Sequence, residues 1–206
     1  VNDSGLRFSD KVPVKIITII PDELKGEDAD LYEVIGTKST FRLSQRPASF
    51  VVLRFDRQEL KKKDSDAILP CPAPFNVLDK SIADVSLLAG LLVDKFQYHL
   101  PLYRQHQRLT DAGITLSRST LTNVVRRAID LLYPIADAQL ASILESKVLA
   151  MDETPIKAGK AGPGKLKQSY FWPVYGDKDE IAFTFSTSRG RQQIERVLKS
   201  RFKGTL

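Results

Sequence analysis

The sequence predicts an α+β protein built in three successive parts. Residues 1–75 contain short runs of β-branched and aromatic residues, separated by prolines and charged turns. In residues 76–145 the apolar positions recur at helical spacing, and residues 146–206 return to strand-like runs before a basic, helical end. We therefore expect a β-rich N-terminal module, a helical middle module and a C-terminal part with the order β-β-β-α.

The composition indicates a folded protein with a real core. Of the 206 residues, 42% are hydrophobic and 27% are charged, which is too apolar for a disordered tail. The single cysteine, Cys71, has no partner for an internal disulfide. No apolar stretch reaches the length of a membrane span and the N-terminus has no signal-peptide core, so we expect a cytoplasmic protein without membrane contact.

The formal net charge of +6 belongs to the last part of the chain. From residue 147 onward there are 12 Lys and Arg against 6 Asp and Glu, whereas residues 1–146 hold 19 of each sign. Basic side chains around a few carboxylates suit a polyanionic partner, with the bases holding phosphates. An ordinary solvated basic surface is the alternative.

The N-terminal module is expected to form a sheet. A β-rich run covers residues 12–20, and alternating apolar and polar residues at 41–43 and 50–55 are typical of antiparallel strands, with Pro47 between them. The proline-rich segment at residues 69–75 marks the first module boundary.

Three helices are expected in the middle module. Ser81 is a candidate N-cap for the first helix, whose apolar positions are Val85, Leu88, Leu91, Leu92 and Phe96. The second helix, at residues 102–112, should stop at Gly113, because glycine readily takes the left-handed conformation that ends a helix. Ser117 is a candidate N-cap for the third helix, whose buried stripe we expect to be Leu121, Val124, Val125 and Ala128.

The second and third helices match the helix-turn-helix pattern. A helix that ends at glycine is followed by a tight turn and then by a helix with a polar, arginine-bearing outer face. The residues that would face a major groove are Arg118, Ser119, Thr122 and Asn123. Arg126 and Arg127 would reach phosphates. An ordinary pair of helices with a solvated face fits the pattern equally well.

A carboxylate follows a short apolar run in the C-terminal part. Residues 148–151 favour a buried strand, which Pro155 stops because proline has no N–H to pair. Asp152 therefore lies where the strand emerges, rigidly held and able to reach a metal ion; the alternative is that it only starts a turn. Glu153 points to the other side of the strand, so we assign it no metal role.

The next stretch is glycine- and lysine-rich. Residues 159–165 match the front of a phosphate-binding loop, but Leu166 stands where a hydroxyl must coordinate magnesium, and a strand follows instead of a helix. We expect a hairpin loop whose Lys165 and Lys167 meet a phosphate backbone. Arg189, which leads into the basic terminal helix, is a further candidate for DNA contact.

The order of these C-terminal elements is that of the start of a ribonuclease H-like fold. Strands at residues 169–175 and 181–186 follow the strand that carries Asp152, and a helix comes next. That fold would then need a parallel strand and more helices, which we do not expect within this sequence. One sheet face would stay uncovered, so we interpret the domain as truncated.

Three segments together resemble transposases of the insertion-sequence-66 (IS66) type. They are His-Leu-Pro-Leu-Tyr-Arg-Gln at residues 99–105, Arg-Ser-Thr-Leu at 118–121 and Asp-Glu-Thr-Pro at 152–155. The resemblance runs from about Tyr32 to the C-terminus. It implies a DDE transposase, in which two Asp and one Glu of a ribonuclease H-like domain bind two Mg²⁺ or Mn²⁺ ions to cut and join transposon-end DNA.

On this resemblance, Asp152 matches the first catalytic, metal-binding aspartate. No position matches the second aspartate or the glutamate, and the cysteine-rich zinc module of the family is also unmatched, so we expect no zinc and interpret His99 and His106 as structural. We expect double-stranded transposon-end DNA as the partner, together with self-association or other transposition proteins. The chain alone should be inactive; a DNA-binding regulator or an inert remnant derived from a transposase are the alternatives.

Overall fold

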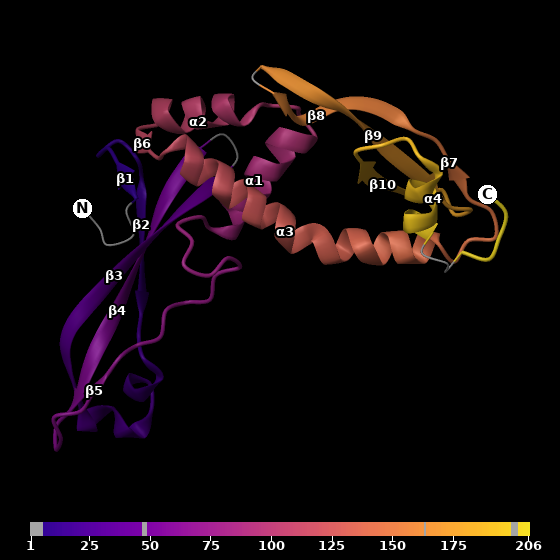
Figure 1. Cartoon of the computed structure of the whole chain (residues 1–206). Helices are drawn as coiled ribbons and strands as arrows, with labels where there is room; N and C mark the ends of the chain where they lie inside the picture. Colours follow the sequence, from indigo (N-terminus) through magenta and orange to yellow (C-terminus); the bar gives the residue numbers. More distant parts are fainter. Residues whose placement is uncertain (1–5, 47–48, 163, 199–201) are drawn as a thin grey trace. The chain divides into compact units, whose positions relative to one another are not determined.

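The structure is a computed structural model that describes residues 6–46, 49–162, 164–198 and 202–206 (Figure 1). It confirms the α+β class. Two compact units divide the chain, Val1–Asp130 and Leu131–Leu206. The expected division into three modules, with boundaries at residues 75 and 145, is finer and stays a prediction.

After a short strand, β1 (Arg7–Phe8), the first unit contains a long, ribbon-like sheet. The strands of this sheet are β2 (Val14–Ile19), β3 (Tyr32–Arg46), β4 (Ser49–Lys62) and β5 (Ile68–Leu69). The antiparallel pairing expected for the middle of this segment is confirmed, because β3 and β4 form a hairpin. β2 pairs with the other edge of β4 in parallel, and β5 pairs with the end of β4. Pro47, expected between the two strands, lies outside the described residues.

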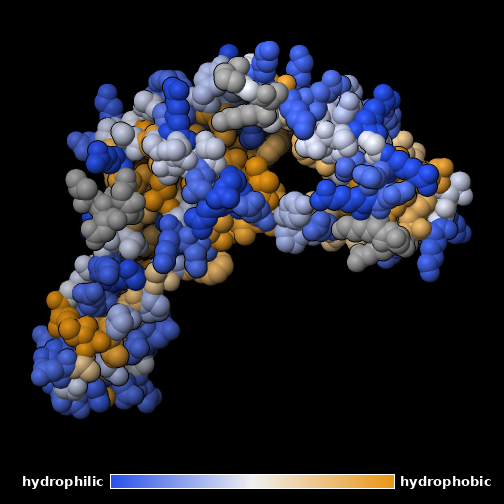
Figure 2. All heavy atoms as spheres, viewed as in Figure 1, coloured by the Kyte–Doolittle hydropathy of each residue, from blue (hydrophilic) through white to orange (hydrophobic). Residues whose placement is uncertain are grey.

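The far end of this ribbon exposes apolar side chains. Two short 3-10 helices, η1 (Asp22–Leu24) and η2 (Glu27–Leu31), lie there without a buried residue. Figure 2 shows the apolar patch in orange at the lower left. The exposed apolar residues of this end are Ile20, Leu31, Val34, Ile35 and Ile68.

The first helix starts later than the sequence indicated. α1 (Val85–Phe96) is capped by Asp84, whose side chain accepts the N–H of Ser86 at 3.2 Å. Ser81 instead accepts the N–H of Ala83 at 3.1 Å, so the predicted cap was wrong by three positions. Both residues suit an N-cap, and local sequence alone does not tell which of them the tertiary structure uses.

The other helices of this unit are α2 (Leu102–Asp111) and the beginning of α3 (Arg118–Ile143), with β6 (Ile114–Thr115) between them. β6 pairs with β1. The stripe expected on the third helix is confirmed, because Leu121, Val124, Val125 and Ala128 are all buried. They join the core of this unit with residues of β3, β4, α1 and α2: Leu43, Val52, Leu87, Leu88, Leu91 and Leu109.

The second unit contains a sheet and a helix. Its elements after α3 are β7 (Ala150–Met151), β8 (Thr154–Gly162), β9 (Lys165–Tyr175), β10 (Ile181–Ser186) and α4 (Arg191–Leu198). The strand order is β10-β9-β7, all antiparallel, and β8 also pairs with β9. Its core consists of Ile143, Leu144, Leu149, Val174 and Ala182, against which Val197, Leu198 and Phe202 pack.

A single parallel bridge lies just before β7, although no strand follows α4 among the described residues. Val148 and Thr205 form a parallel bridge. The N–H of Leu149 donates to the Thr205 carbonyl at 2.9 Å, and the N–H of Thr205 donates to the Lys147 carbonyl at 3.0 Å. The chain thus returns after α4 to the edge of the first strand.

Among the described residues, no helix is both long enough and apolar enough to span a membrane.

Candidate nucleic-acid interface and carboxylate site

The turn between α2 and α3 is formed by the residues that the sequence indicated. Gly113 has φ +83°, and its N–H donates to the Thr110 carbonyl at 2.9 Å. The Ser117 hydroxyl accepts the N–H of Thr120 at 3.0 Å, which confirms the predicted N-cap. α3 therefore begins at Arg118, directly after a capped and conformationally fixed turn.

A histidine ties α2 to the segment that leads into α3. A ring nitrogen of His106 hydrogen-bonds the Leu116 carbonyl at 2.6 Å. This contact fits the structural role expected for His106. His99 lies in the turn before α2 with φ +54°, an uncommon conformation for a residue with a side chain.

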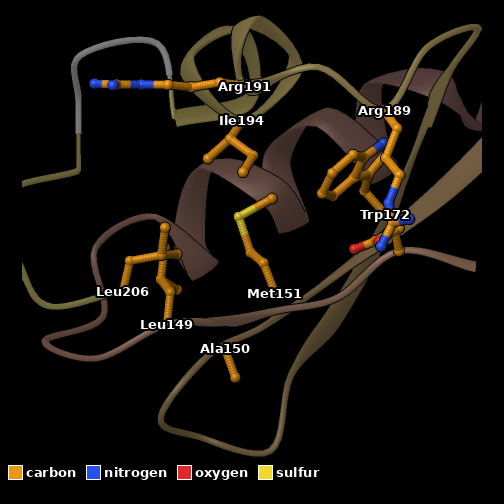
Figure 3. Close-up of a pocket in the computed structure, with 9 residues that line it drawn as sticks. Leu149, Ala150, Met151, Trp172, Arg189, Arg191, Ile194 and Leu206 are labelled. Carbon is orange, nitrogen blue, oxygen red and sulfur yellow. The ribbon is translucent and has the colours of Figure 1, made fainter.

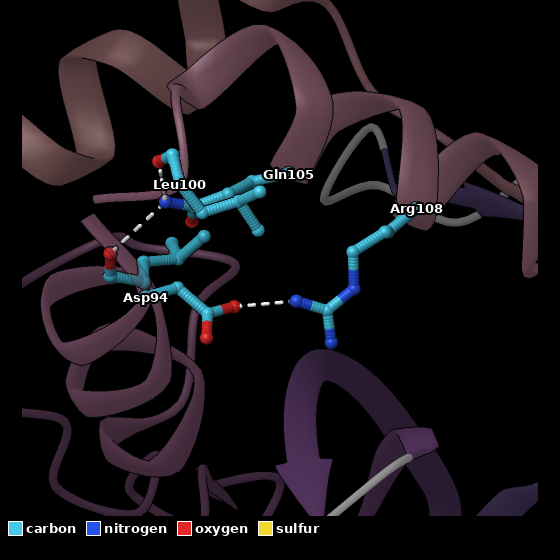
Figure 4. Close-up of polar contacts among 5 residues, drawn as sticks. Asp94, Leu100, Gln105 and Arg108 are labelled. Atoms are coloured by element: carbon cyan, nitrogen blue, oxygen red, sulfur yellow. Dashed lines mark hydrogen bonds and ion pairs between the residues drawn. The ribbon is translucent and has the colours of Figure 1, made fainter. Parts of the chain in front are cut away.

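A buried glutamine holds the α1–α2 corner (Figure 4). The Gln105 side chain is 3% exposed, and its Nε2 donates to the Leu100 carbonyl at 3.0 Å. Beside it, Arg108 and Asp94 form an ion pair of 2.6 Å between α2 and α1. Sequence reasoning missed Gln105, because a glutamine in a polar helix gives no indication that its amide is buried.

The outer face of α3 presents the side chains predicted to face a DNA groove. Arg118, Ser119, Thr122, Asn123 and Arg126 are all exposed. The Thr122 hydroxyl donates to the Arg118 carbonyl at 2.9 Å, and Arg126 donates to the Asn123 side chain at 3.1 Å. These are local bonds of an uncovered helix face, so the structure leaves the face available without testing its role.

Arg127 has a different environment from its neighbour Arg126. It is half-buried, and its guanidinium donates to the Asp79 carbonyl at 2.8 Å. That bond ties α3 to the loop before α1. The guanidinium is thus already used within the protein, which weakens the prediction that it reaches a phosphate.

Asp152 lies directly after β7, on the side of the sheet opposite to α4. In Figure 3, Leu149 and Met151 point toward Ile194 of α4, while Ala150 points the other way. Alternation along the strand places Asp152 on the side of Ala150. The Asp152 side chain is exposed, and its Oδ1 accepts the N–H of Glu153 at 2.8 Å.

Glu153 lies on the α4 side, as expected from the alternation. Its carboxylate forms an ion pair with Arg189, and both residues border a hollow of about 620 Å³ (Figure 3). The hollow is otherwise lined by Leu149, Met151, Trp172, Ile194 and Leu206, among others. Arg189, predicted to contact DNA, is therefore paired with a carboxylate of its own chain, and its DNA contact stays a prediction.

The lysines of the β8–β9 hairpin are free of close carboxylates in the described contacts. Lys165 and Lys167 lie at the start of β9 and are exposed. Gly164, just before them, has φ +69°, which suits glycine at a hairpin turn. A strand follows the glycines, which agrees with the rejection of a phosphate-binding loop.

Comparison with models of known protein families shows which family the chain belongs to. The model of the family described as "Transposase IS66 family" matches residues 80–206, which include α1 to α4 and Asp152. The chain belongs to the IS66 transposase family. The resemblance stated from the three sequence motifs is thereby confirmed.

Curated relatives of this IS66 family member come from Sinorhizobium fredii. The uncharacterized protein y4jD is 34% identical over 181 residues, which are 84% of this chain and 35% of y4jD. The uncharacterized protein y4hP is 36% identical over 59% of this chain and 22% of its own length. The uncharacterized protein y4qI is 27% identical over 93% of this chain. The chain thus spans between 22% and 37% of the length of these relatives.

DDE transposases use divalent metal ions, and the surroundings of Asp152 meet only part of what such an ion requires. Magnesium takes six oxygen ligands in octahedral geometry, and proteins supply one or two carboxylates among them. Within the described residues no group of three or more His, Cys, Asp or Glu could hold a metal. Asp152 supplies one exposed carboxylate, which by itself is not a metal site.

Proposed function

We propose that this chain serves DNA transposition as part of a DDE transposase, binding transposon-end DNA and contributing the first metal-binding aspartate. The observation that carries the proposal is the position of Asp152 within the region that matches the IS66 family. It follows β7, which pairs antiparallel with β9, and a parallel bridge joins Val148, just before β7, to Thr205.

The sheet order supports a ribonuclease H-like assignment. The chain runs through β7, β9 and β10 as an antiparallel sheet and crosses by α4, and Thr205 then forms a parallel bridge with Val148, just before β7. This is the order in which a ribonuclease H-like domain starts, and in that fold the strand equivalent to β7 is an inner strand. A carboxylate at the end of an inner strand is held rigidly while its oxygens stay accessible.

The DNA-binding role rests on the helices of the first unit. The N-terminal part of α3 presents Arg118, Ser119, Thr122 and Asn123 to solvent after a tight turn. Amide and guanidinium groups recognise adenine and guanine edges in a major groove, so Asn123 and Arg118 are assigned to bases and Arg126 to a phosphate. The helix-turn-helix arrangement places such residues at the start of the second helix.

Selection from a random duplex pool tests the DNA-binding part. The full chain should enrich a defined sequence, and its affinity should fall steeply with salt because phosphate contacts release counterions. Asn123→Ala should lose the base preference at about one position, whereas Arg126→Ala should weaken binding to all sequences alike. Asp152→Asn is the matched control and should bind as the unchanged chain does. Failure to enrich any sequence at low salt would refute the DNA-binding proposal.

Manganese titration tests the carboxylate part without relying on activity. Paramagnetic Mn²⁺ should broaden the amide resonances next to Asp152 at millimolar concentration, since one carboxylate binds a hard cation weakly. Asp152→Asn should abolish the broadening and Glu153→Gln should leave it unchanged. The chain alone should give no nicked product on transposon-end DNA with Mg²⁺ or Mn²⁺. Broadening that survives Asp152→Asn would contradict the assignment.

A further inference from the structure

The first half of the turn between α2 and α3 is held by the start of the chain. β6 lies in this turn and pairs with β1 (Figure 1). The N–H of Ser9, just after β1, donates to the Gly113 carbonyl at 2.8 Å. The Ile114 side chain is 1% exposed, and the Phe8 ring packs on Phe41 of β3 with the ring centroids 6.2 Å apart. These contacts fix the turn up to β6 against the core of the first unit.

The second half of the turn is held by His106 of α2. Its Nε2 lies 2.6 Å from the carbonyl oxygen of Leu116. A carbonyl only accepts hydrogen bonds, so Nε2 carries the proton and donates it. Leu116 directly precedes Ser117, whose hydroxyl accepts the N–H of Thr120 in the first turn of α3. The imidazole therefore connects α2 to the capped start of α3.

The side chains predicted to face a major groove begin two residues after Leu116. They are Arg118, Ser119, Thr122 and Asn123. Recognition of a base edge requires that a side chain be placed within about 0.5 Å. Phosphate attraction is far less exacting, because charges act over about 10 Å at 0.1 M salt. Freedom of α3 to shift against α2 would thus reduce base discrimination more than overall affinity.

We propose that His106 is a positioning residue for DNA recognition, whose ring N–H fixes the start of α3 against α2 and so aligns Arg118 and Asn123 with the base edges. The inference rests on the proposed function and adds a residue that acts through the Leu116 carbonyl without contacting DNA. His106 is half-buried, and its Nε2 is already used within the protein. Loss of the imidazole leaves the β1–β6 pairing and the Ser117 cap in place, so the unit folds while the start of α3 gains freedom.

A contribution to stability alone is the competing explanation for this hydrogen bond. Gln105, the preceding residue of α2, provides the comparison. Its side chain is 3% exposed and donates to the Leu100 carbonyl at the α1–α2 corner, away from the turn before α3. Gln105→Ala should therefore destabilise the same unit through a lost hydrogen bond without changing the base preference.

Fluorescence anisotropy of the full chain tests the inference with two labelled probes, the duplex enriched from the random pool and a duplex of random sequence. The measured quantity is the ratio of the two affinities, at a temperature where circular dichroism shows every variant folded. His106→Ala should lower this ratio about 5- to 150-fold, the discrimination that one bidentate base contact supplies. Its affinity for the random duplex should change by less than about twofold, because phosphate contacts provide that affinity.

Two further variants separate positioning from stability. His106→Gln, whose amide N–H can donate to the same carbonyl, should restore most of the ratio, and Gln105→Ala should keep it. Hydrogen exchange follows α3 without DNA, since the N–H of Leu121 donates to the Ser117 carbonyl at 3.1 Å in its first turn. Exchange at Leu121 should accelerate in His106→Ala relative to exchange at Val125, one turn further along, and this relative rate should stay unchanged in Gln105→Ala.

The outcomes distinguish the role of His106 from the proposed function. If the unchanged chain discriminates between the duplexes and His106→Ala keeps the full ratio, the positioning role is overturned and the proposed function stands. An equal loss of the ratio in Gln105→Ala, or no recovery in His106→Gln, attributes the effect to stability and also overturns the positioning role. If the unchanged chain selects no duplex, the DNA-binding part of the proposed function fails, and the role assigned to His106 fails with it.

Discussion

The Glu153 carboxylate forms an ion pair with the Arg189 guanidinium on the α4 side of the sheet, whereas Asp152, directly before it, is exposed on the opposite side. The two acids are adjacent in sequence and have different surroundings because a strand turns successive side chains to opposite faces. Glu153 is 19% exposed in this pair and Arg189 is 70% exposed. Glu153 therefore belongs to the packing of α4 and its preceding loop, and Asp152 is the acid that is left accessible.

Neutralising the two acids should affect stability differently. Glu153→Gln should lower the free energy of unfolding by at most about 1 kcal/mol, because the guanidinium partner is largely in water and screened. Asp152→Asn should change it by less than about 0.5 kcal/mol, since the side chain is exposed and its neighbour's N–H can donate to the amide oxygen. Urea denaturation of both variants measures the difference. A larger loss for Asp152→Asn than for Glu153→Gln would contradict the assignment of roles.

The buried amide of Gln105 should be important for stability. Gln105→Ala removes the donor to the Leu100 carbonyl in a site that is 3% exposed, which should cost about 1–3 kcal/mol. Gln107→Ala, on the exposed side of the same helix, is the control and should cost less than about 0.5 kcal/mol. Thermal unfolding by circular dichroism compares the two. Equal melting temperatures would show that the hydrogen bond to Leu100 contributes nothing.

Asp177 should make the stability of the second unit depend on pH. The backbone N–H of Lys147 and the Ser146 hydroxyl hold the pKa of Asp177 below its ordinary value of 3.8. A carboxylate with a lowered folded-state pKa stabilises the protein above its unfolded pKa, and this contribution is lost as pH falls through the folded value. The melting temperature of Asp177→Asn should therefore be lower than that of the unchanged chain at neutral pH. The difference should shrink below about pH 4, and one that grows in acid would contradict this cause.

The parallel bridge between Val148 and Thr205 should depend on Gly204. A Cβ at Gly204 would overlap the carbonyl oxygen of Lys147, which belongs to the backbone and has little freedom to shift. Gly204→Ala should therefore disturb the hydrogen bonds between Thr205 and the start of β7 and cost about 1–3 kcal/mol. Gly190→Ala, where a Cβ has no heavy atom closer than 3.9 Å, is the control. Faster hydrogen exchange at Leu149 in Gly204→Ala alone measures the effect.

Local patterns predicted much of the helical region. Ser117 caps α3, Gly113 takes a left-handed conformation, and the apolar stripe of α3 is buried. Each of these depends on residues within one or two turns, so the sequence contains the information. The sequence predicted Ser81 as the N-cap of α1, whereas the structure uses Asp84. Both residue types can cap a helix, and the choice depends on how the loop before α1 packs on β3.

Residue type and spacing alone predicted the α+β class and the helix pair with its polar outer face, and the resemblance to IS66 transposases selected Asp152 as the candidate acid. Hydrogen bonds between distant segments decided the rest: Arg127 bonds Asp79, Glu153 pairs with Arg189, and Thr205 returns in parallel to Val148. These partners are 36 to 57 residues apart, so local sequence patterns do not predict that they pair. They meet only when the sheet and helices bury their apolar faces.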